Sequence, residues 1–257
     1  MVRLVKPFWL SHDGKAIYSV DAHPTELVVA TGGADFRVCV WDVSSVFTAG
    51  PSRPKLLAAM RLNHNVNTIR WSSDGRLLAC GCDDSTVTVF RLAEDCPEGY
   101  LDEKELFFRK YEKLYHLQEH TKSVTGVAFS DGSALLATCG MDQRAVIWDI
   151  ATGKKIAVLE HPEPVYGVCW DPIGAFLFTQ TATRAFVWNA QTHHPEKTLK
   201  RFFKLAEHQN FFLRPSWSPD GTNLLMVGTV SKKNKFTAVT LFRDFEAETA
   251  FSGHQKE

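Results

Sequence analysis

The sequence predicts an all-β protein assembled from repeated four-stranded antiparallel sheets, and three observations support this fold class. Pairs of short apolar runs joined by Ser/Asp/Pro/Gly turns recur along the chain, which is typical of antiparallel strand pairs. Six histidines return at intervals of 41 to 56 residues, a period that indicates structural repeats: His12, His64, His120, His161, His208 and His254. The 18 Phe and 7 Trp residues are of the types that strands favour.

Length and composition allow one large domain or two small ones. The chain has 257 residues, of which 44% are hydrophobic, and its 29 acidic and 29 basic residues balance. No stretch approaches the ~20 apolar residues of a membrane span, and the first residues lack the apolar region of a signal peptide. Since the net charge is zero, we expect no membrane partner and at most an indirect contact with DNA.

Each repeat is expected to contain four strands. The first two are expected in the segments that begin at Ile17, Val66, Val124, Val165 and Leu213. A third strand follows in FRVCVWDV, STVTVFRL, QRAVIWDI, TRAFVWNA and FTAVTLFRD. A fourth follows in PKLLAAMRL, EKLYHLQ, KKIAVLE, KTLKRFFKL and EAETAFS. The predicted units span about 14–62, 64–119, 120–160, 161–206 and 208–253.

Residues 93–113 interrupt the second unit between its third and fourth strands. Their neighbourhood mixes charged residues with a partial helical stripe made of Leu101, Leu106, Phe107, Tyr111 and Leu114. We expect an insert that packs on the outer edge of the sheet. The alternative is a loop that docks a partner, because long loops often carry recognition.

Two basic clusters, Lys197–Lys204 and Ser231–Lys235, lie in a predicted outer strand and in a hairpin turn. Because the chain has no net charge, a solvated surface is the favoured interpretation of both. Contact with DNA phosphates, or a weak nuclear-import signal, is the alternative.

The six cysteines fall at positions 39, 80, 82, 96, 139 and 169, and five of them lie in apolar, strand-like runs. Because no Cys-x-x-Cys pair occurs, we expect reduced core thiols rather than disulfides or zinc ligands, in the cytosol or the nucleus. His193 and His194 have no acid or thiol at ligand spacing. The sequence therefore predicts neither a metal site nor a cofactor.

The pairs Trp41-Asp42 and Trp148-Asp149, together with the returning histidines, resemble the WD40 repeat of β-propellers over the whole chain. This resemblance implies a buried hydrogen-bonded chain in each sheet, made of a loop histidine, a Ser/Thr, a turn aspartate and a tryptophan. Two sets match fully, and both place Asp six residues before Trp: His12, Thr31, Asp35, Trp41 and His120, Thr138, Asp142, Trp148.

The other units match the WD40 pattern incompletely. The second keeps His64 and Asp84 but has Cys80 and Phe90 in place of the hydroxyl and the indole. The fourth keeps His161, Thr179 and Trp188 but has Ala182 where the acid belongs, and the fifth has Phe242 and no evident acid. A hydrolase needs one exposed nucleophile rather than several buried copies, so we expect these sets to be structural and not catalytic.

Residues outside the WD40 consensus resemble a narrower family. LVKPFWLSHDGKAIYSVDAHP, ATGGADFRVCVWDVSSVF and LRPSWSPDG are similar to the N-terminal propeller of the HIRA/Hir histone-chaperone family. VIWDIATGKKIAVLEHPEPVYGVCWDPIGAF also resembles the related propeller subunit of chromatin assembly factor.

The HIRA/Hir resemblance implies a non-enzymatic nuclear scaffold. Members of that family deposit histones H3–H4 independently of replication and regulate transcription. Their propeller docks ubinuclein-like subunits, while other regions bind the anti-silencing-function chaperone, and histone contact is direct or indirect. The alternatives are the chromatin assembly factor subunit and a generic WD40 adaptor of another nuclear or cytosolic complex. An enzyme is the remote alternative.

The same resemblance implies seven blades, of which about five are expected here, so we expect an open or truncated ring. Residues 2–9 would supply the closing strand of a missing last blade. An open array leaves two sheet faces bare, which favours association. We therefore expect a chain that was cut short or that something else completes.

Overall fold

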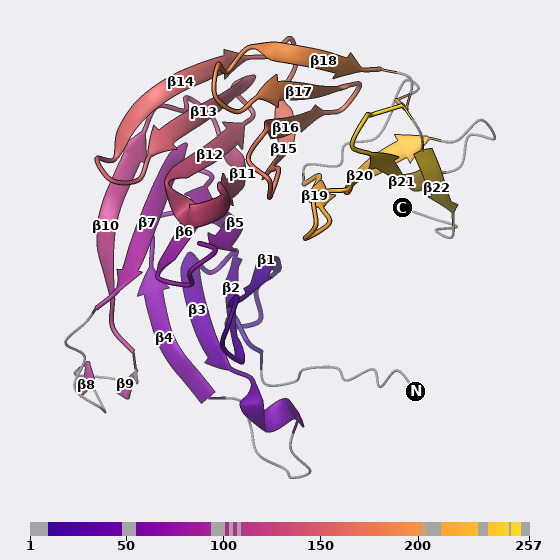
Figure 1. Ribbon diagram of the computed structural model, residues 1–257. Coiled ribbons are helices and arrows are strands. Elements are labelled where there is room, and N and C mark those ends of the chain that lie inside the picture. Colours follow the sequence, from indigo (N-terminus) through magenta and orange to yellow (C-terminus); the bar gives the residue numbers. More distant parts are fainter. Residues whose placement is uncertain are drawn as a thin grey trace.

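The computed structural model describes residues 10–47, 55–93, 101–102, 105–106, 109–200, 202–203, 212–230, 236–246 and 248–252. Within these residues it contains five four-stranded antiparallel sheets and one two-stranded hairpin, which confirms the predicted all-β class. The five sheets follow one another along an arc (Figure 1). No helix of the described part has the length and apolarity needed to cross a membrane.

All five sheets keep their strands in sequence order, so each strand pairs with the next one of its sheet along the chain. The first contains β1 (Ile17–Ala22), β2 (Val28–Gly33), β3 (Arg37–Asp42) and β4 (Lys55–Arg61). The second contains β5 (Val66–Trp71), β6 (Leu77–Cys82), β7 (Thr86–Leu92) and β10 (Tyr111–Gln118). The third contains β11 (Val124–Phe129), β12 (Leu135–Gly140), β13 (Arg144–Asp149) and β14 (Lys154–Glu160).

The fourth and fifth sheets repeat this plan. The fourth contains β15 (Val165–Trp170), β16 (Phe176–Thr181), β17 (Ala185–Asn189) and β18 (Pro195–Leu199). The fifth contains β19 (Ser216–Trp217), β20 (Asn223–Val230), β21 (Phe236–Phe242) and β22 (Glu248–Ser252). Two short 3₁₀ helices, η1 (Ser44–Phe47) and η2 (Asp131–Ser133), lie in connections.

The first strand of each sheet lies on the inner side of the arc. Adjacent pairs of these strands contact each other in the series β1, β5, β11, β15 and β19, whereas β4, β10, β14 and β18 lie on the outer side (Figure 1). The second strands are buried without alternation: β6, β12 and β16 are buried along almost their whole length. A strand buried on both faces needs a neighbouring sheet on each side, so the sheets pack face to face.

Small residues allow this packing to be close. A Cβ at Gly32 of β2 would lie 2.6 Å from Val66 Cγ1 of the second sheet, and a Cβ at Gly81 of β6 would lie 2.4 Å from Val124 Cγ1 of the third. Both distances are far inside van der Waals contact, so a larger side chain at either glycine would push the two sheets apart. The two glycines thus serve the same purpose in successive sheets.

The described part of the insert in the second sheet forms strands, and not the helix that its partial helical pattern suggested. β8 (Leu101–Asp102) and β9 (Glu105–Leu106) pair as a short antiparallel hairpin, and β10 begins at Tyr111. The helical interpretation was wrong because Leu101 and Leu106 pair with each other in this hairpin, while Tyr111 and Leu114 belong to the outer strand of the sheet. The fourth strand of the fourth sheet also ends earlier than predicted, at Leu199.

Several expected features lie outside the described residues or at their edges. The closing strand at 2–9, the histidines at 208 and 254, Cys96 and the basic cluster at 231–235 are outside. Among the described cysteines, Cys80, Cys82, Cys139 and Cys169 are free thiols. No strand of the fifth sheet pairs with the first among the described residues, and both end sheets expose large apolar side chains, such as Val20 and Phe251.

Candidate functional site

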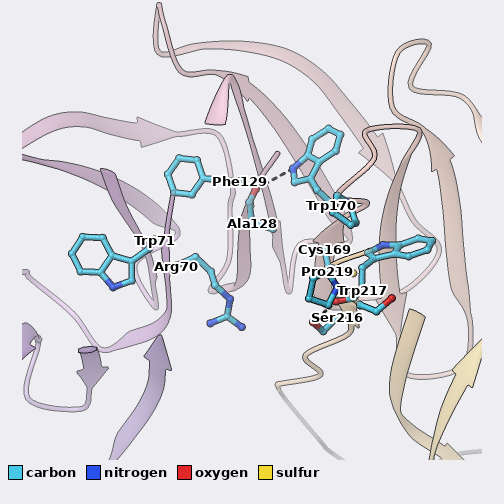
Figure 2. Close-up of a pocket in the computed structure, with 11 residues that line it drawn as sticks. Arg70, Trp71, Ala128, Phe129, Cys169, Trp170, Ser216, Trp217 and Pro219 are labelled. Atoms are coloured by element: carbon cyan, nitrogen blue, oxygen red, sulfur yellow. Dashed lines mark hydrogen bonds between the residues drawn. The ribbon is translucent and has the colours of Figure 1, made fainter. Parts of the chain in front are cut away.

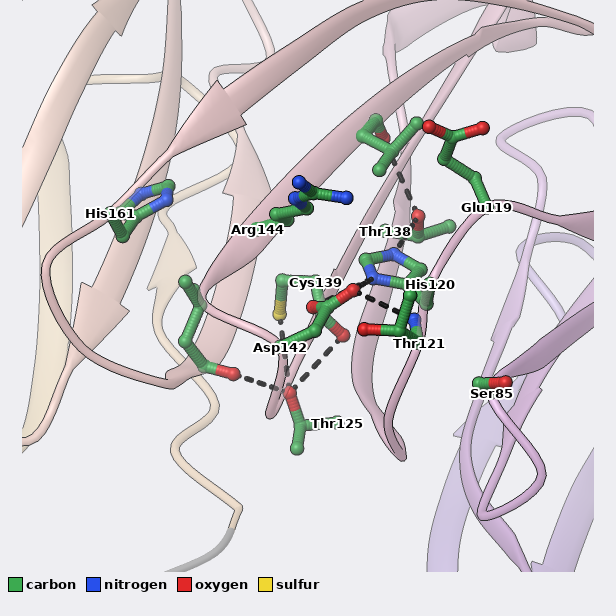
Figure 3. Close-up of polar contacts among 12 residues, drawn as sticks. Ser85, Glu119, His120, Thr121, Thr125, Thr138, Cys139, Asp142, Arg144 and His161 are labelled. Carbon is green, nitrogen blue, oxygen red and sulfur yellow. Dashed lines mark hydrogen bonds and ion pairs between the residues drawn. The ribbon is translucent and has the colours of Figure 1, made fainter.

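The third sheet contains a buried hydrogen-bonded chain of four side chains, and Figure 3 shows three of them, His120, Thr138 and Asp142. His120 Nδ1 lies 3.0 Å from both carboxylate oxygens of Asp142, and its Nε2 lies 2.8 Å from the Thr138 hydroxyl. The Trp148 indole N–H donates to the same hydroxyl oxygen over 3.0 Å. With Nδ1–H donating to the carboxylate, Nε2 accepts from the hydroxyl, so each ring nitrogen and the hydroxyl have a partner.

Asp142 remains ionised in this setting. Burial by itself raises the pKa of its carboxyl, but the hydrogen bond and charge of His120 and the backbone N–H groups of Thr121 and Arg144 hold that pKa below its usual value. The N–H of Thr121 donates to Asp142 Oδ2 over 3.0 Å, which ties the histidine loop to the turn after β12. The carboxylate therefore orients the imidazole and joins two connections of one sheet.

The first sheet repeats this chain. His12 Nδ1 lies 2.7 Å from Asp35 Oδ1 and its Nε2 lies 2.8 Å from Thr31 Oγ1, to which the Trp41 indole N–H donates over 2.8 Å. The histidine and the threonine are almost fully buried. One difference is that the second carboxylate oxygen of Asp35 is buried without a hydrogen-bond partner.

The fourth sheet forms the chain without an acid. The Trp188 indole donates to Thr179 Oγ1 over 2.8 Å, and His161 Nε2 lies 2.8 Å from that hydroxyl. His161 Nδ1 donates instead to the backbone carbonyl of Leu159 over 2.9 Å. Burial lowers the pKa of His161 to about 4, against the raising effect of the backbone groups of Leu159 and Gln143, so the imidazole is neutral near pH 7.

The second sheet does not join His64 to Asp84, contrary to their expected roles. His64 is exposed and contacts the Phe36 ring, while Asp84 accepts hydrogen bonds from the Thr86 backbone N–H and hydroxyl. The reason is that Cys80 provides no hydroxyl to bridge histidine and indole. The Asn65 and Asn67 side-chain amides donate to Asp83 instead, over 2.8 and 2.7 Å, a polar link that sequence reasoning missed.

The described residues of the fifth sheet do not form this chain, and their register corrects the position assigned to Phe242. Leu241 pairs with Leu224 as Trp148 pairs with Leu136 in the third sheet, so Leu241 occupies the tryptophan position. Phe242 follows it and is 48% exposed. Met226, fully buried, stands where the other sheets have the threonine hydroxyl. Apolar residues therefore replace the network rather than leaving it half satisfied.

An ion pair between a buried aspartate and a partly exposed arginine joins the fourth and fifth sheets, and the sequence analysis did not identify it. Asp171 is fully buried and receives both Nη atoms of Arg243, over 2.9 and 2.5 Å. The backbone N–H groups of Ile173 and Ala175 also donate to it, each over 3.0 Å. Burial alone raises the pKa of Asp171, but Arg243 and these two N–H groups hold it below the usual value. One sequence signal could have identified this pair: Asp171 stands at the position where a serine begins the equivalent turns of other sheets.

Polar side chains meet where the inner strands run side by side. Arg214, just before β19, donates through Nη1 to Ser19 Oγ over 2.9 Å and through Nη2 to the carbonyl oxygens of Tyr18 and Asn67, over 2.7 and 3.3 Å. These bonds link the fifth sheet to the first and second. Burial, together with repulsion from Arg70, lowers the pKa of Arg214 to about 10, while Asp21 opposes that shift.

A cavity of about 220 Å³ opens at the ends of the inner strands. Its lining includes the aromatic residues that end β5, β11, β15 and β19, which are Trp71, Phe129, Trp170 and Trp217. Figure 2 shows the Arg70 guanidinium extending into the space between the second sheet and the tryptophans of the fourth and fifth. Among the described residues, no group of three or more His, Cys, Asp or Glu side chains is placed to hold a metal ion.

Comparisons with known proteins agree with this architecture. A family model described as the CAF1B/HIR1 beta-propeller domain matches residues 3–249. Protein HIR1 of Cryptococcus neoformans is 30% identical over 268 residues, which cover 99% of this chain and 30% of that protein. Protein hir1 of Schizosaccharomyces pombe is 26% identical over 273 residues, which cover 99% of this chain and 29% of that protein. The chain thus spans less than a third of the length of these relatives.

The first prediction concerns the aspartate of the third sheet. Replacing Asp142 with Ala leaves the buried His120 Nδ1 and the Thr121 N–H without their acceptor, so we expect a loss of about 1–3 kcal/mol in the free energy of unfolding. Urea denaturation at pH 7 measures this loss. Replacing Asp84 with Ala in the second sheet is the matched control and should cost less, because Asp84 contacts only its own turn among the described residues. Equal losses would contradict the assigned role.

The second prediction is a dependence of stability on pH. His161 has an unfolded pKa of about 6.5 and a folded pKa of about 4, so the unfolded state binds a proton first as the pH falls. Stability is therefore lost between about pH 6.5 and pH 4, on the order of 2 kcal/mol by pH 5. Urea denaturation at pH 7.5 and pH 5 measures this loss of stability. The loss should be smaller in His161→Gln than in the unaltered protein. It should be unchanged in His194→Gln, which removes an exposed histidine.

The third prediction tests the ion pair between the fourth and fifth sheets. Asp171→Ala leaves the backbone N–H groups of Ile173 and Ala175 and the partly exposed Arg243 without their acceptor, so we expect a loss of about 1–3 kcal/mol in the free energy of unfolding. Glu160→Ala removes a surface pair with Arg144 in which the Glu160 side chain is 65% exposed, and we expect about 0–1 kcal/mol. If chemical denaturation gave the two variants the same stability, the bridge would not join the sheets as described.

Proposed function

This chain belongs to the CAF1B/HIR1 β-propeller family, and we propose that it is the non-enzymatic scaffold domain of a HIRA-like histone-chaperone complex. The complex would assemble nucleosomes independently of replication by depositing histones H3–H4, and would thereby regulate transcription. The observation that carries this proposal is the family match across residues 3–249, together with fungal HIR1 proteins that align over 99% of the chain.

The structure supports a scaffold rather than a catalyst. The repeated His, Thr and Trp sets are buried inside separate sheets, where substrate has no access to them. Each set fixes a loop to a strand, and bonds such as those of Arg214 fix one sheet to another. A rigid array of this kind presents its loops in constant positions, which is how propellers hold partner segments.

The partners that we propose follow the family resemblance. A ubinuclein-like subunit would dock on the propeller, and the anti-silencing-function chaperone would bind through other regions of the whole protein. Contact with H3–H4 would be direct or through these subunits, contact with DNA would be indirect, and the location would be the nucleus. The matching family model carries the names of both HIR1 and CAF1B, so the chromatin assembly factor subunit is the second candidate. The HIR1 relatives favour the first.

We also propose that further sheets of the same propeller cover the two end faces. Val20 of β1 is 59% exposed and Phe251 of β22 is 55% exposed, and Leu225, Ala238 and Phe251 line an open apolar cavity on the fifth sheet. Large apolar side chains at these positions are costly unless they are covered. Two further sheets would make the seven that the family resemblance implies.

The fourth prediction tests the proposed complex. Affinity purification of the whole protein from nuclear extract should recover H3–H4 and chaperone subunits, and deletion of the propeller should remove the ubinuclein-like subunit. Extract from cells arrested before DNA replication should give the same histone yield, because the proposed deposition is independent of replication. Recovery of histones only during replication would favour the chromatin assembly factor role. Recovery of neither histones nor chaperone subunits would contradict both roles.

A further inference from the structure

We propose that the cavity beside Arg70 binds the carboxylate side chain of a partner peptide. The cavity lies where the inner strands of four consecutive sheets end, and it was not part of the hydrogen-bonded chains described above. The proposal does not rest on the chromatin assignment, because it follows from the residues of the cavity alone.

The first argument is that Arg70 has no ion-pair partner among the described residues. Its only described hydrogen bond is from Nη1 to the carbonyl oxygen of Ile69, over 2.8 Å. A guanidinium has five N–H donors, so most of those of Arg70 have no acceptor among the described residues, and Arg70 lines the cavity. Figure 2 shows the group directed away from Trp71 and into the open space.

The second argument is the local excess of positive charge. Arg70 and Arg214 are close enough for their repulsion to lower the pKa of Arg214, and one nearby carboxylate, Asp21, faces both of them. Asp21 is committed to the second sheet, because its Oδ2 accepts the backbone N–H of Trp71 over 2.8 Å. Burial raises the pKa of Asp21, against the lowering effects of Arg70, of backbone N–H groups and of Arg214. One anion brought into the cavity would balance the second guanidinium.

Size and lining select the occupant. A volume of about 220 Å³ is smaller than the ~300–1,000 Å³ of sites for drug-sized ligands, so the cavity suits one side chain rather than a nucleotide. The aromatic rings can cover the methylene groups of a glutamate while its two oxygens meet the Arg70 fork. The same guanidinium would repel a lysine or a methylated lysine, which excludes a cationic peptide.

The fifth prediction uses the whole protein and two neutral-ended peptides. Acetyl-Gly-Ala-Glu-Ala-Gly-amide should change the tryptophan fluorescence on titration, and the same peptide with Gln in place of Glu should bind at least about tenfold more weakly, because a charge-assisted pair is lost. Arg70→Gln should reduce binding of the Glu peptide by a similar factor. Arg76→Gln is the matched control, since Arg76 lies in the turn after β5 and its side chain is 85% exposed.

Several other results of these titrations would overturn the proposal. Equal binding of the Glu and Gln peptides to the unaltered protein would overturn the proposal, and that comparison holds even where Arg70→Gln does not fold. Equal effects of Arg70→Gln and Arg76→Gln would also overturn it, as would the absence of any titration. Inorganic phosphate is the third probe: a response to phosphate without a response to the Glu peptide would assign the cavity to phosphoryl groups instead of carboxylates.

Discussion

The middle strands of the described sheets are buried on both faces, so each of these sheets depends on the neighbours that cover it. The second strands show this constraint most clearly, since β6, β12 and β16 are buried along almost their entire length without alternation. Face-to-face packing follows, and it requires small residues at the points of nearest approach, such as Gly32 against Val66 and Gly81 against Val124. Polar groups between the sheets must then be satisfied internally, because water cannot reach them.

Three sheets meet that requirement with the same device, a threonine hydroxyl shared between an imidazole and an indole. The remaining sheets change this device to different extents. In the fourth sheet a backbone carbonyl replaces the acid, and in the fifth Met226 and Leu241 replace both the hydroxyl and the indole. The second sheet keeps a histidine and an acid without the bridge, and there His64 is exposed and the acid caps its own turn. A partly satisfied buried network is less stable than none, which explains this pattern.

Much of the fold could be predicted because the strand pattern and the repeat period are local features of the sequence. The His120 and His12 sets were identifiable for the same reason, since a fixed spacing within one sheet brings them together. Phe242 was misplaced because β20 carries an irregularity between Met226 and Thr229, next to Gly228 at φ 68°, which the spacing alone does not reveal. The pair of Asp171 and Arg243 was missed because it joins two sheets 72 residues apart in sequence. A repeat pattern does not show which residues of two neighbouring sheets face each other, because that depends on how the sheets pack in three dimensions.

The two faces of the inner strands differ in how far their residue types repeat from sheet to sheet. Their outward side chains, such as Ile69 and Val168, pack between sheets and are restricted to apolar residues. The side chains that face the axis are under no such restriction, and equivalent positions hold Asp21, Arg70, Ala128, Cys169 and Ser216. A polar or charged residue is tolerated at the axis when it finds a hydrogen-bond partner there, as Asp21 does in the backbone N–H of Trp71. Differences in binding among propellers of this architecture can therefore arise at the axis without disturbing the fold, and the charge around Arg70 and Arg214 is the individual feature of this chain at that position.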